Sequence, residues 1–459
     1  MDWEPIISDL YINIARTIPW GFRAMVKPML KEAAEKKCLQ RNAAQVTEAD
    51  LVTALFDITP GPFQAEARQQ LQAMGIDVDR YIRLQEIDRQ YRVSWENFGK
   101  AFHPGNIHFA MYITDRCNQH CLHCAASAPL HRPELSIRQW ISIIENLESS
   151  LRKEGRHGVY IWFGGEPTLR GDIGELIQYC GQKGYYQAII TNGVLFDDAF
   201  AEFCAQHDMS HVFVSFDSAD PDKNDSIRGA AGSLAAAKQA VTNARKHGLF
   251  VCASTTVTRH NIDELEQIKA MAQEWGAMPY FRAVVKQKKA AANWQEIGLR
   301  QEDYRRLYDF KYHEAMQAIR NGKAGTLPIY SIYEMVPFME EPQNDAEMTA
   351  LEWGVGCQAC RTMAGVDVNG DIFPCGYPSD LTLGNGLIDS FTDIMASQLF
   401  RDIRDRKRTG QCATCNHLKL CGGGCRVHAE SETGDFFAPF PQCWHTDEIK
   451  TKSVTPEVI

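Results

Sequence analysis

The sequence predicts an α/β protein whose core is a partial barrel of six parallel strands, preceded by a small helical domain and followed by a cysteine-rich domain. Between residues 105 and 290, short apolar runs of strand length alternate with amphipathic helical segments. That alternation is typical of strand–helix units in a parallel sheet. Six units suit an open or partial barrel better than a closed eight-stranded one. After residue 351 the chain is rich in Gly and Cys and loses regular periodicity, which predicts a separate domain.

Length, charge and the first residues limit the classes of protein to which the chain can belong. A chain of 459 residues is too long for one ordinary hydrophobic core. No apolar run approaches the ~20 residues that span a bilayer, and the opening MDWEPIISDL lacks the basic-then-apolar order of a secretion signal. A net charge of −10 argues against a nucleic acid partner. We therefore expect a cytoplasmic protein that binds neither membrane nor nucleic acid.

The N-terminal domain, residues 1–90, is expected to consist of short helices. Apolar residues recur at three- and four-residue steps through SDLYINIARTIPWGFRAMVKPMLKEAAEKK, with breaks expected at Pro19 and Pro28. A further helix is predicted after Thr47, which is a suitable cap because Asp50 follows three residues later.

The barrel is expected between residues 105 and 290. Amphipathic helices fit between its strands, for example from Ser136, and from Ser233 to a closing Gly248. Residues 291–350 are expected to form a helical linker, and 351–459 the C-terminal domain. Functional groups of parallel α/β folds gather at the C-terminal ends of the strands, so polar residues at these ends are site candidates. The six strands are predicted at 107–113, 158–163, 187–191, 211–216, 250–257 and 279–285.

Directly after the first predicted strand, Cys117, Cys121 and Cys124 form a C-x3-C-x2-C array. Three thiols this close cannot all pair with one another, and disulfides rarely persist in a reducing compartment, so the array indicates a metal site. A 4Fe–4S cluster has four iron corners, each normally capped by a thiolate, so three cysteines would leave one iron open. Zinc is the alternative, with His120 or His123 as a fourth ligand.

The ends of the next strands carry groups that suit an ammonium, hydroxyls and a carboxylate, which are the functional groups of S-adenosylmethionine. Paired glycines let a backbone approach a ligand closely, a carboxylate beside them suits an ammonium group, and an arginine can pair with a carboxylate. The residues concerned are Gly164, Gly165, Glu166, Asn192, Ser215, Asp217 and Arg228.

Eight further cysteines lie between residues 357 and 443, in the order C-x2-C-x9-G-x4-C, a gap, then C-x2-C-x5-C-x3-C-x17-C. Eight thiols can make two complete four-thiolate sites. A pair of structural zinc sites is the alternative. Because a segment with so little periodicity buries little apolar surface, it needs such sites in order to fold.

The motifs CNQHCLHC, GGEP, TNG and VSFDS…IRG, over about residues 105–285, closely resemble the radical S-adenosylmethionine (radical SAM) superfamily. The resemblance implies a partial (β/α)6 barrel of the radical SAM type. It implies a catalytic cluster on Cys117, Cys121 and Cys124, whose open iron binds the amino and carboxylate groups of S-adenosylmethionine. Contacts to the amino group are implied for Gly164, Gly165 and Glu166, and contacts to ribose and carboxylate for Ser215, Asp217 and Arg228. Asn192 belongs to the TNG motif, and His123 would pack against adenine.

The C-terminal cysteine order resembles the SPASM domain, in which two auxiliary 4Fe–4S clusters have interleaved ligands. The resemblance implies that the first cluster binds Cys357, Cys360, Cys375 and Cys425, and the second Cys412, Cys415, Cys421 and Cys443. Full ligation of both clusters implies a role in electron transfer. Sulfatase-maturating relatives carry an aspartate directly after the cysteine of the G-x4-C element, whereas this chain has Gly376, so we disfavour sulfatase maturation.

The resemblance also implies the chemistry. A reductant such as flavodoxin or ferredoxin would supply one electron, S-adenosylmethionine would be cleaved, and a 5′-deoxyadenosyl radical would abstract a substrate hydrogen away from oxygen. A peptide or protein side chain is the favoured substrate (a maturase), then a tetrapyrrole, then a small molecule. Basic residues near the sixth strand are candidates for meeting substrate carboxylates, with solvated surface as the alternative: Arg282, Lys286, Lys288 and Lys289.

Two alternatives remain open at this point. The N-terminal segment resembles the small helical domain of the dark-operative protochlorophyllide reductase B subunit through Trp3, the Ile18–Pro19 turn, Arg23 and VTEADL; a helical cap or partner-docking module is the alternative. For the whole chain, the rival to a radical enzyme is a non-catalytic iron–sulfur electron carrier or a zinc-stabilised binding protein.

Overall fold

The computed structural model describes residues 3, 5–40, 45–76, 78, 98, 100–101, 105–126, 132–320 and 356–443. The chain forms two compact units, Met1–Gln90 and Tyr91–Ile459, which are described separately below. The helix predicted beyond residue 320 lies outside the described residues. Within the described part of the chain, no helix has both the length and the apolar composition needed to cross a membrane.

The first unit is helical, as predicted. Its core is formed by small and aliphatic side chains of α2 and α3, including Leu30, Ala34 and Leu51. Thr47 caps α3 as expected, because its hydroxyl accepts a hydrogen bond from the Asp50 backbone and its own N–H donates to the Asp50 carboxylate at 2.9 Å. The helices are α1 (Pro5–Thr17), α2 (Trp20–Gln40), α3 (Glu48–Ile58) and α4 (Gly61–Ala73).

One expected helix break in this unit is wrong. Pro19 separates α1 from α2, but α2 continues through Pro28. A proline inside a helix costs about 3 kcal/mol because it cannot donate to the preceding turn. Here Leu30, Ala34 and Cys38 follow at four-residue steps and are all fully buried, so packing of this face outweighs the local cost.

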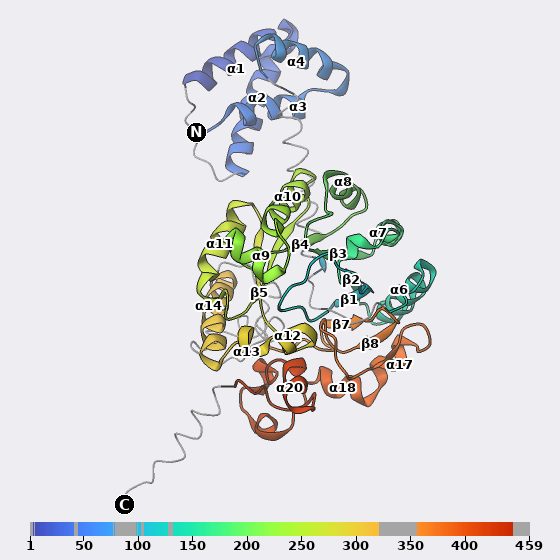
Figure 1. Cartoon of the computed structure of the whole chain (residues 1–459). Coiled ribbons are helices and arrows are strands. Elements are labelled where there is room, and N and C mark those ends of the chain that lie inside the picture. The colour runs from blue at the N-terminus through green and yellow to red at the C-terminus, as the bar shows by residue number, and fades with distance from the viewer. Residues whose placement is uncertain are drawn as a thin grey trace, which may run out of the picture. The chain divides into compact units, whose positions relative to one another are not determined.

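The second unit is built on one nine-stranded sheet with the order β6-β5-β4-β3-β2-β1-β7-β8-β9 (Figure 1). Strands β1 to β6 are all parallel and follow one another in sequence order, and each coincides with a predicted strand to within two residues. The α/β partial barrel is thereby confirmed, with its outer edges at β6 and β9. The first six strands are β1 (Ile107–Thr114), β2 (Gly158–Gly164), β3 (Tyr186–Thr191), β4 (His211–Ser215), β5 (Val251–Val257) and β6 (Met278–Ala283).

Helices surround the outside of these strands (Figure 1). Ser136 caps the first of them, as predicted, in a capping box with Gln139. The predicted helix from Ser233 ends before Gly248, which has a positive φ. The helices are α6 (Ile137–Arg152), α7 (Ile173–Lys183), α8 (Asp198–Gln206), α9 (Pro221–Arg228), α10 (Ser233–Lys246), α11 (Leu265–Glu274), α12 (Lys288–Ala292), α13 (Trp294–Ile297) and α14 (Gln301–Arg320), with 3-10 turns η1 (Pro167–Leu169) and η2 (Ile262–Glu264).

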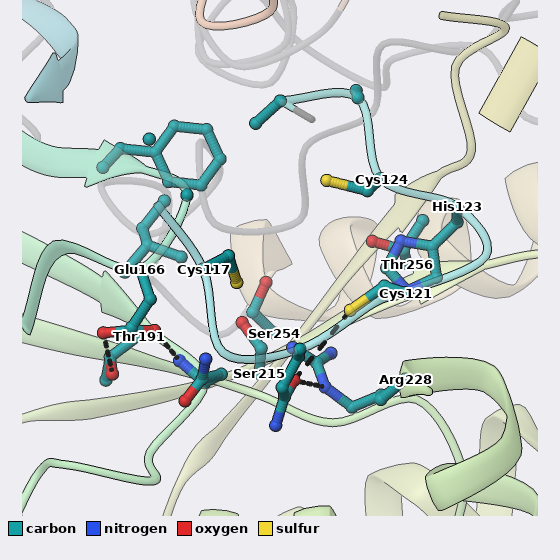
Figure 2. Close-up of a pocket in the computed structure, with 18 of the residues that line it drawn as sticks. Cys117, Cys121, His123, Cys124, Glu166, Thr191, Ser215, Arg228, Ser254 and Thr256 are labelled. Atoms are coloured by element: carbon teal, nitrogen blue, oxygen red, sulfur yellow. Dashed lines mark hydrogen bonds between the residues drawn. The ribbon is translucent and has the colours of Figure 1, made fainter. Parts of the chain in front are cut away.

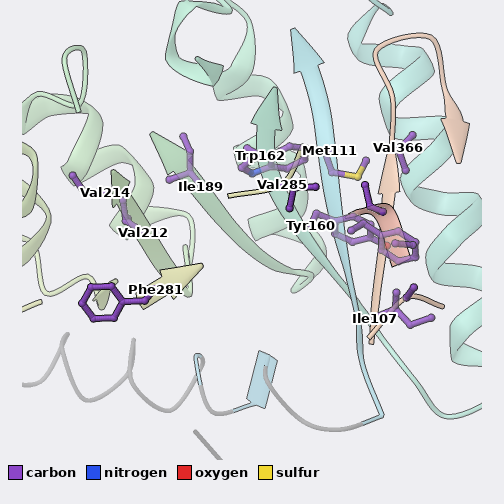
Figure 3. Packing of buried hydrophobic residues seen from close by; sticks show 14 of the residues in the cluster. Ile107, Met111, Tyr160, Trp162, Ile189, Val212, Val214, Phe281, Val285 and Val366 are labelled. Atoms are coloured by element: carbon purple, nitrogen blue, oxygen red, sulfur yellow. The ribbon is translucent and has the colours of Figure 1, made fainter. Parts of the chain in front are cut away.

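Alternation along β1 separates the hydrophobic core from the barrel interior. Ile107 and Met111 belong to the large core that the strands share with the outer helices (Figure 3). Ala110 and Tyr112 belong instead to a small cluster inside the barrel. Since side chains of a strand point to opposite faces in turn, β1 contributes both to stability and to the interior surface.

The cysteine-rich segment begins by extending the barrel sheet. Strand β7 (Met363–Val366) pairs in parallel with β1, and β8 (Asp371–Phe373) and β9 (Gly384–Asn385) continue the sheet in antiparallel fashion. The remaining elements are short: α17 (Phe391–Ala396), α18 (Gln398–Arg404), η4 (Gly410–Thr414), α19 (Leu418–Cys421) and α20 (Arg426–Thr433).

The shared core generates a stability prediction. Ile189 in β3 is fully buried, whereas Ile388 is 83% exposed. Ile189→Ala should lower the free energy of unfolding by about 2–5 kcal/mol because it leaves a cavity, and Ile388→Ala should change it by less than about 0.5 kcal/mol. Urea unfolding of the two variants measures this difference, and equal midpoints would contradict the packing described.

Candidate functional site

A cavity of about 820 Å³ opens at the C-terminal ends of the barrel strands. All the residues predicted for the catalytic cluster and S-adenosylmethionine line it, except Asp217. Figure 2 shows Cys117, Cys121 and Cys124 on one loop, with Glu166 on one side and Arg228 on the other. The structure therefore brings the predicted site residues, from the ends of four strands and one helix, together around one cavity.

The cysteine loop is attached by its main chain to the end of α9. His120 N–H donates to the Arg228 carbonyl at 3.1 Å, and Leu122 N–H donates to the Ile227 carbonyl at 2.9 Å. Gly229 has φ +60°, and a Cβ there would lie 2.8 Å from the His120 oxygen. The IRG sequence thus serves to seat the cysteine loop as well as to present an arginine.

The paired glycines after β2 approach the same loop from the other side. Gly165 N–H donates to the Thr114 carbonyl and Glu166 N–H to the Arg116 carbonyl, both at 2.7 Å. A Cβ on Gly164 would lie 2.3 Å from the Thr114 oxygen, and one on Gly165 would lie 2.1 Å from the Arg116 oxygen. These glycines are therefore required by a close approach of two protein backbones, a reason that the sequence alone did not reveal.

The buried Glu166 carboxylate joins β2 to β3. It accepts hydrogen bonds from the Thr191 hydroxyl at 2.8 Å and from the Asn192 N–H at 2.7 Å, and a further one from Thr168. Burial raises the pKa of Glu166, although these donors act in the opposite direction. A cation placed in the cavity would lower that pKa again, since an opposite charge favours the ionised carboxylate.

Asp217 lies behind the cavity wall. It is fully buried, and one of its oxygens accepts from His123 Nε2 at 2.8 Å and from Arg228 Nη1 at 2.7 Å. The Thr256 N–H donates to its other oxygen at 2.8 Å. Burial alone would raise the pKa of Asp217, but His123 and Arg228 hold it well below its usual range. The charged aspartate orients two side chains that do line the cavity.

Sequence reasoning missed Ser254, Thr256 and Tyr377, which line the cavity, whereas Arg282 was predicted only as a substrate contact. Ser254 and Thr256 alternate on β5 and face inward, and the run CASTTV offered a period-two polar signal that could have identified them. Arg282 on β6 lies between two rings, with its guanidinium 5.6 Å from the Tyr280 centroid and 5.5 Å from that of Tyr377. Tyr377 comes from the C-terminal segment and had no local signal.

A second cavity, of about 780 Å³, is lined by Cys357, Cys375 and Cys425. Arg282 and Tyr377 line both cavities, so the two adjoin at these side chains. The fourth residue of this predicted set, Cys360, is fully buried, and its pKa is raised by burial and by the nearby Cys357.

The second predicted cluster set consists of Cys412, Cys415, Cys421 and Cys443, and the first three of these lie near one another. Burial, with Cys421 and Cys415 nearby, raises the pKa of Cys412 to about 11. Cys443 is buried, and its N–H donates to the Phe440 carbonyl at 3.1 Å. Within the described residues, no group of three or more His, Cys, Asp or Glu side chains is already spaced to hold a metal ion.

The donor chemistry nevertheless fits iron–sulfur clusters. Burial raises the pKa of Cys121 to about 11, while Arg228 acts to lower it. Burial would also raise the pKa of Cys357, but Arg426, Arg408 and Arg406 more than offset this and leave it below its usual value. Thiolates are the ligands of such clusters and are deprotonated when they bind metal, so cations beside the thiols favour assembly.

Of the basic residues predicted to meet substrate, Arg282 lines the cavities. Lys286 forms an ion pair with Glu432 at 3.0 Å, and Lys289 donates to the His120 carbonyl. Lys288 is exposed. Arg282 is therefore the cation best placed to contact a molecule inside the barrel.

Comparison with known proteins agrees with this geometry. Residues 111–272 match the family model of the radical SAM superfamily, and residues 357–416 match SPASM, an iron–sulfur cluster-binding domain. The chain is 30% identical over 338 residues to the mycofactocin maturase MftC of Mycobacterium ulcerans, covering 72% of this chain and 86% of that protein.

Two further proteins extend the comparison. An AdoMet-dependent heme synthase of Nitratidesulfovibrio vulgaris is 26% identical over 356 residues, covering 76% of this chain and 93% of that protein. The solved structure of anSMEcpe with bound AdoMet and the Cp18Cys peptide shares the fold, with a TM-score of 0.55 at 18% identity, over 76% of this chain and 96% of that chain.

The backbone contact at Gly165 generates a second prediction. Gly165→Ala should push the cysteine loop away from β2, because the added Cβ has no room beside the Arg116 carbonyl. We expect reconstituted protein to lose the iron and the EPR signal of the Cys117, Cys121 and Cys124 site. Gly171→Ala, whose Cβ would meet nothing within 4 Å, is the control. Full cluster content in Gly165→Ala would show that the contact is dispensable.

Proposed function

The chain belongs to the radical SAM superfamily and carries a SPASM domain, and on this premise we propose that it cleaves S-adenosylmethionine reductively and uses the 5′-deoxyadenosyl radical to abstract a substrate hydrogen. One observation carries the assignment: three thiols of one loop border the cavity that also holds Glu166, Ser215 and Arg228. A 4Fe–4S cluster bound by three thiols would have one iron without a protein ligand, and the amino and carboxylate groups of S-adenosylmethionine would bind there.

Each lining residue has a role in this proposal. Cys117, Cys121 and Cys124 hold the catalytic 4Fe–4S cluster, which supplies the electron for cleavage. The Gly164–Glu166 segment orients the ammonium group of S-adenosylmethionine through main-chain oxygens and the carboxylate.

Other groups orient the rest of the cofactor. Hydroxyls of Ser215, Ser254 and Thr256 contact the ribose and the carboxylate, and Arg228 adds a cation that Asp217 holds in place. The ring of His123 packs beside adenine. The Asn192 side chain supports the cysteine loop, since its Nδ2 donates to the side-chain Oδ1 of Asn118 at 2.7 Å.

The C-terminal segment is proposed to hold two auxiliary 4Fe–4S clusters. The first takes Cys357, Cys360, Cys375 and Cys425, which the second cavity and their mutual effects on pKa support. The second takes Cys412, Cys415, Cys421 and Cys443. Both transfer electrons, and a flavodoxin or ferredoxin in the reducing cytoplasm is the proposed donor.

For domain organisation we propose a helical N-terminal domain at 1–90, the radical SAM barrel at 105–290, a helical linker at 291–350 and the SPASM domain at 351–459. The boundary between the compact units at Gln90 and the extent of strands β1 to β6 support these limits. The N-terminal domain serves as a cap or as a docking module.

The proposed substrate is a peptide or protein side chain that enters where the two cavities adjoin. MftC relatives are named as maturases, and the solved structure of anSMEcpe, which has the same fold, contains bound AdoMet and the Cp18Cys peptide. The second candidate is a tetrapyrrole, which the heme synthase relative supports. A carboxylate on either substrate would meet Arg282, which lines both cavities. Gly376 follows Cys375 in the second cavity and Asp380 is exposed, which keeps sulfatase maturation disfavoured.

The catalytic assignment is tested by cysteine substitution. Anaerobically reconstituted protein should contain about twelve iron atoms and form 5′-deoxyadenosine with dithionite. Cys124→Ala should retain about eight iron atoms and form none of the product, because the catalytic cluster needs all three thiols. Cys204→Ala, which removes a buried thiol of α8 far from both cysteine sets in sequence, is the control. Intact S-adenosylmethionine in iron-loaded wild type would favour an electron carrier.

The substrate assignment is tested at Arg282. Candidate peptides and iron-containing tetrapyrroles are compared by their effect on 5′-deoxyadenosine formation. With the accepted substrate, Arg282→Met should lower kcat/KM about 10- to 100-fold, since a charge-assisted hydrogen bond contributes about 1.5–3 kcal/mol. Lys288→Met removes an exposed charge nearby and should have little effect. An unchanged kcat/KM in Arg282→Met would contradict a carboxylate contact.

A further inference from the structure

Two arginines of the SPASM domain are buried among neutral partners. Arg408 is 7% exposed and Arg426 is 1% exposed. Arg408 donates to the carbonyls of Gly422 at 2.9 Å and Ala438 at 2.8 Å, and also to that of Gly424. These partners carry no charge, so they satisfy the guanidinium's hydrogen bonds and leave its positive charge uncompensated.

Arg426 is placed in the same way. Its guanidinium donates to the Lys407 carbonyl at 2.8 Å and lies 5.2 Å from the centroid of the Phe437 ring. Its Nε is buried and has no hydrogen-bond partner within the part of the chain that the structure describes. Among the described residues neither arginine forms an ion pair with a carboxylate. Since burying an isolated charge costs several kcal/mol, the fold needs negative charge close to both.

Thiols are the groups that both arginines face. Arg426 lines the second cavity together with Cys357, Cys375 and Cys425. Its charge acts to lower the pKa of Cys357 and of Cys360, which belong to the same set.

Arg408 donates to the carbonyls of Gly422 and Gly424, which lie between Cys421 of the second set and Cys425 of the first. Its charge acts to lower the pKa of Cys357 in the first set and opposes the larger effect of burial on Cys412 in the second. Arg408 is thus placed between both sets, whereas Arg426 lines the cavity of the first.

A glycine triplet encloses Arg408. Residues 422–424 connect Cys421 of the second set to Cys425 of the first. Gly423 has φ +77°, and a Cβ there would lie 2.5 Å from Arg408 Nε and 3.0 Å from its Cγ. The segment that joins the two ligand sets is therefore shaped around this guanidinium, which fixes it between them.

We propose that Arg408 is a counter-charge shared by the two auxiliary clusters and that Arg426 is a counter-charge of the first cluster alone. Both are positioning residues that make the clusters easier to reduce. This inference rests on the proposed function, because it requires two clusters with the interleaved ligands given above. A fixed positive charge stabilises the more negative, reduced state of a nearby cluster. Loss of Arg408 should therefore lower both potentials, and loss of Arg426 only that of the first.

The test is an EPR-monitored redox titration of full-length protein carrying Cys117→Ala, Cys121→Ala and Cys124→Ala, so that only auxiliary clusters contribute. In Arg408→Gln we expect the equilibrium constant for one-electron reduction to fall at least tenfold for both clusters. This corresponds to a decrease of ~59 mV in each reduction potential. Arg426→Gln should shift one cluster by a similar factor and leave the other unchanged. Arg408→Lys should restore most of the potential, because it keeps the charge.

Lys407→Gln is the matched control, because it removes a positive charge from the neighbouring residue, whose side chain is 59% exposed and paired with Asp402. It should shift neither cluster. Iron analysis separates the hypothesis of two auxiliary clusters from the hypothesis that arginines act as their counter-charges. Fewer than about eight iron atoms in the parent protein, which carries only the three cysteine substitutions, would overturn the proposed clusters. If the parent protein holds its full iron but the potentials of Arg408→Gln are unchanged, the role of Arg408 as a shared counter-charge is overturned and the proposed clusters are not. If Arg408→Gln loses auxiliary iron, recovery in Arg408→Lys supports the charge, and failure of both variants overturns it.

Discussion

The close approach of two backbones at the top of the barrel is the constraint on which the site depends. Two main-chain hydrogen bonds of 2.7 Å join the segment after β2 to the segment after β1, and only residues without a side chain allow them at Gly164 and Gly165. The cysteine loop starts at this contact, and its far end rests on α9. Because both anchors are main-chain contacts, the direction of the loop is set by the barrel.

Over the described ranges, the positive charge of buried arginines is compensated at the catalytic loop but not in the SPASM domain. At the catalytic loop, the Arg228 guanidinium is neutralised by the buried Asp217, and the two form a rigid pair behind the wall. In the SPASM domain, Arg408 and Arg426 are held by carbonyls and rings and keep their charge. If the C-terminal domain holds the clusters proposed above, this uncompensated positive charge would stabilise an electron placed on them.

The sequence predicted what local signals determine. Strand positions follow from apolar runs of the right length, and the caps at Thr47 and Ser136 follow from short polar motifs. It did not predict the inward face of β5, where Ser254 and Thr256 line the cavity, because Thr255 between them is also polar and obscures the alternation. The position of Tyr377 beside Arg282 depends on contacts between segments far apart in the chain, and no spacing rule reveals such contacts.

Strand β1 carries the start of the catalytic loop, and its second edge is covered by β7. The ribosome makes β7 only after all six barrel strands and the helices around them have been made. Until then, a nascent barrel exposes unpaired N–H and C=O groups along a strand that is apolar on both faces, which is a template for aggregation. The barrel is thus completed during biosynthesis only when the C-terminal segment with β7 has been made. A chain truncated before β7 is expected to aggregate and is therefore unsuitable for preparing the barrel alone.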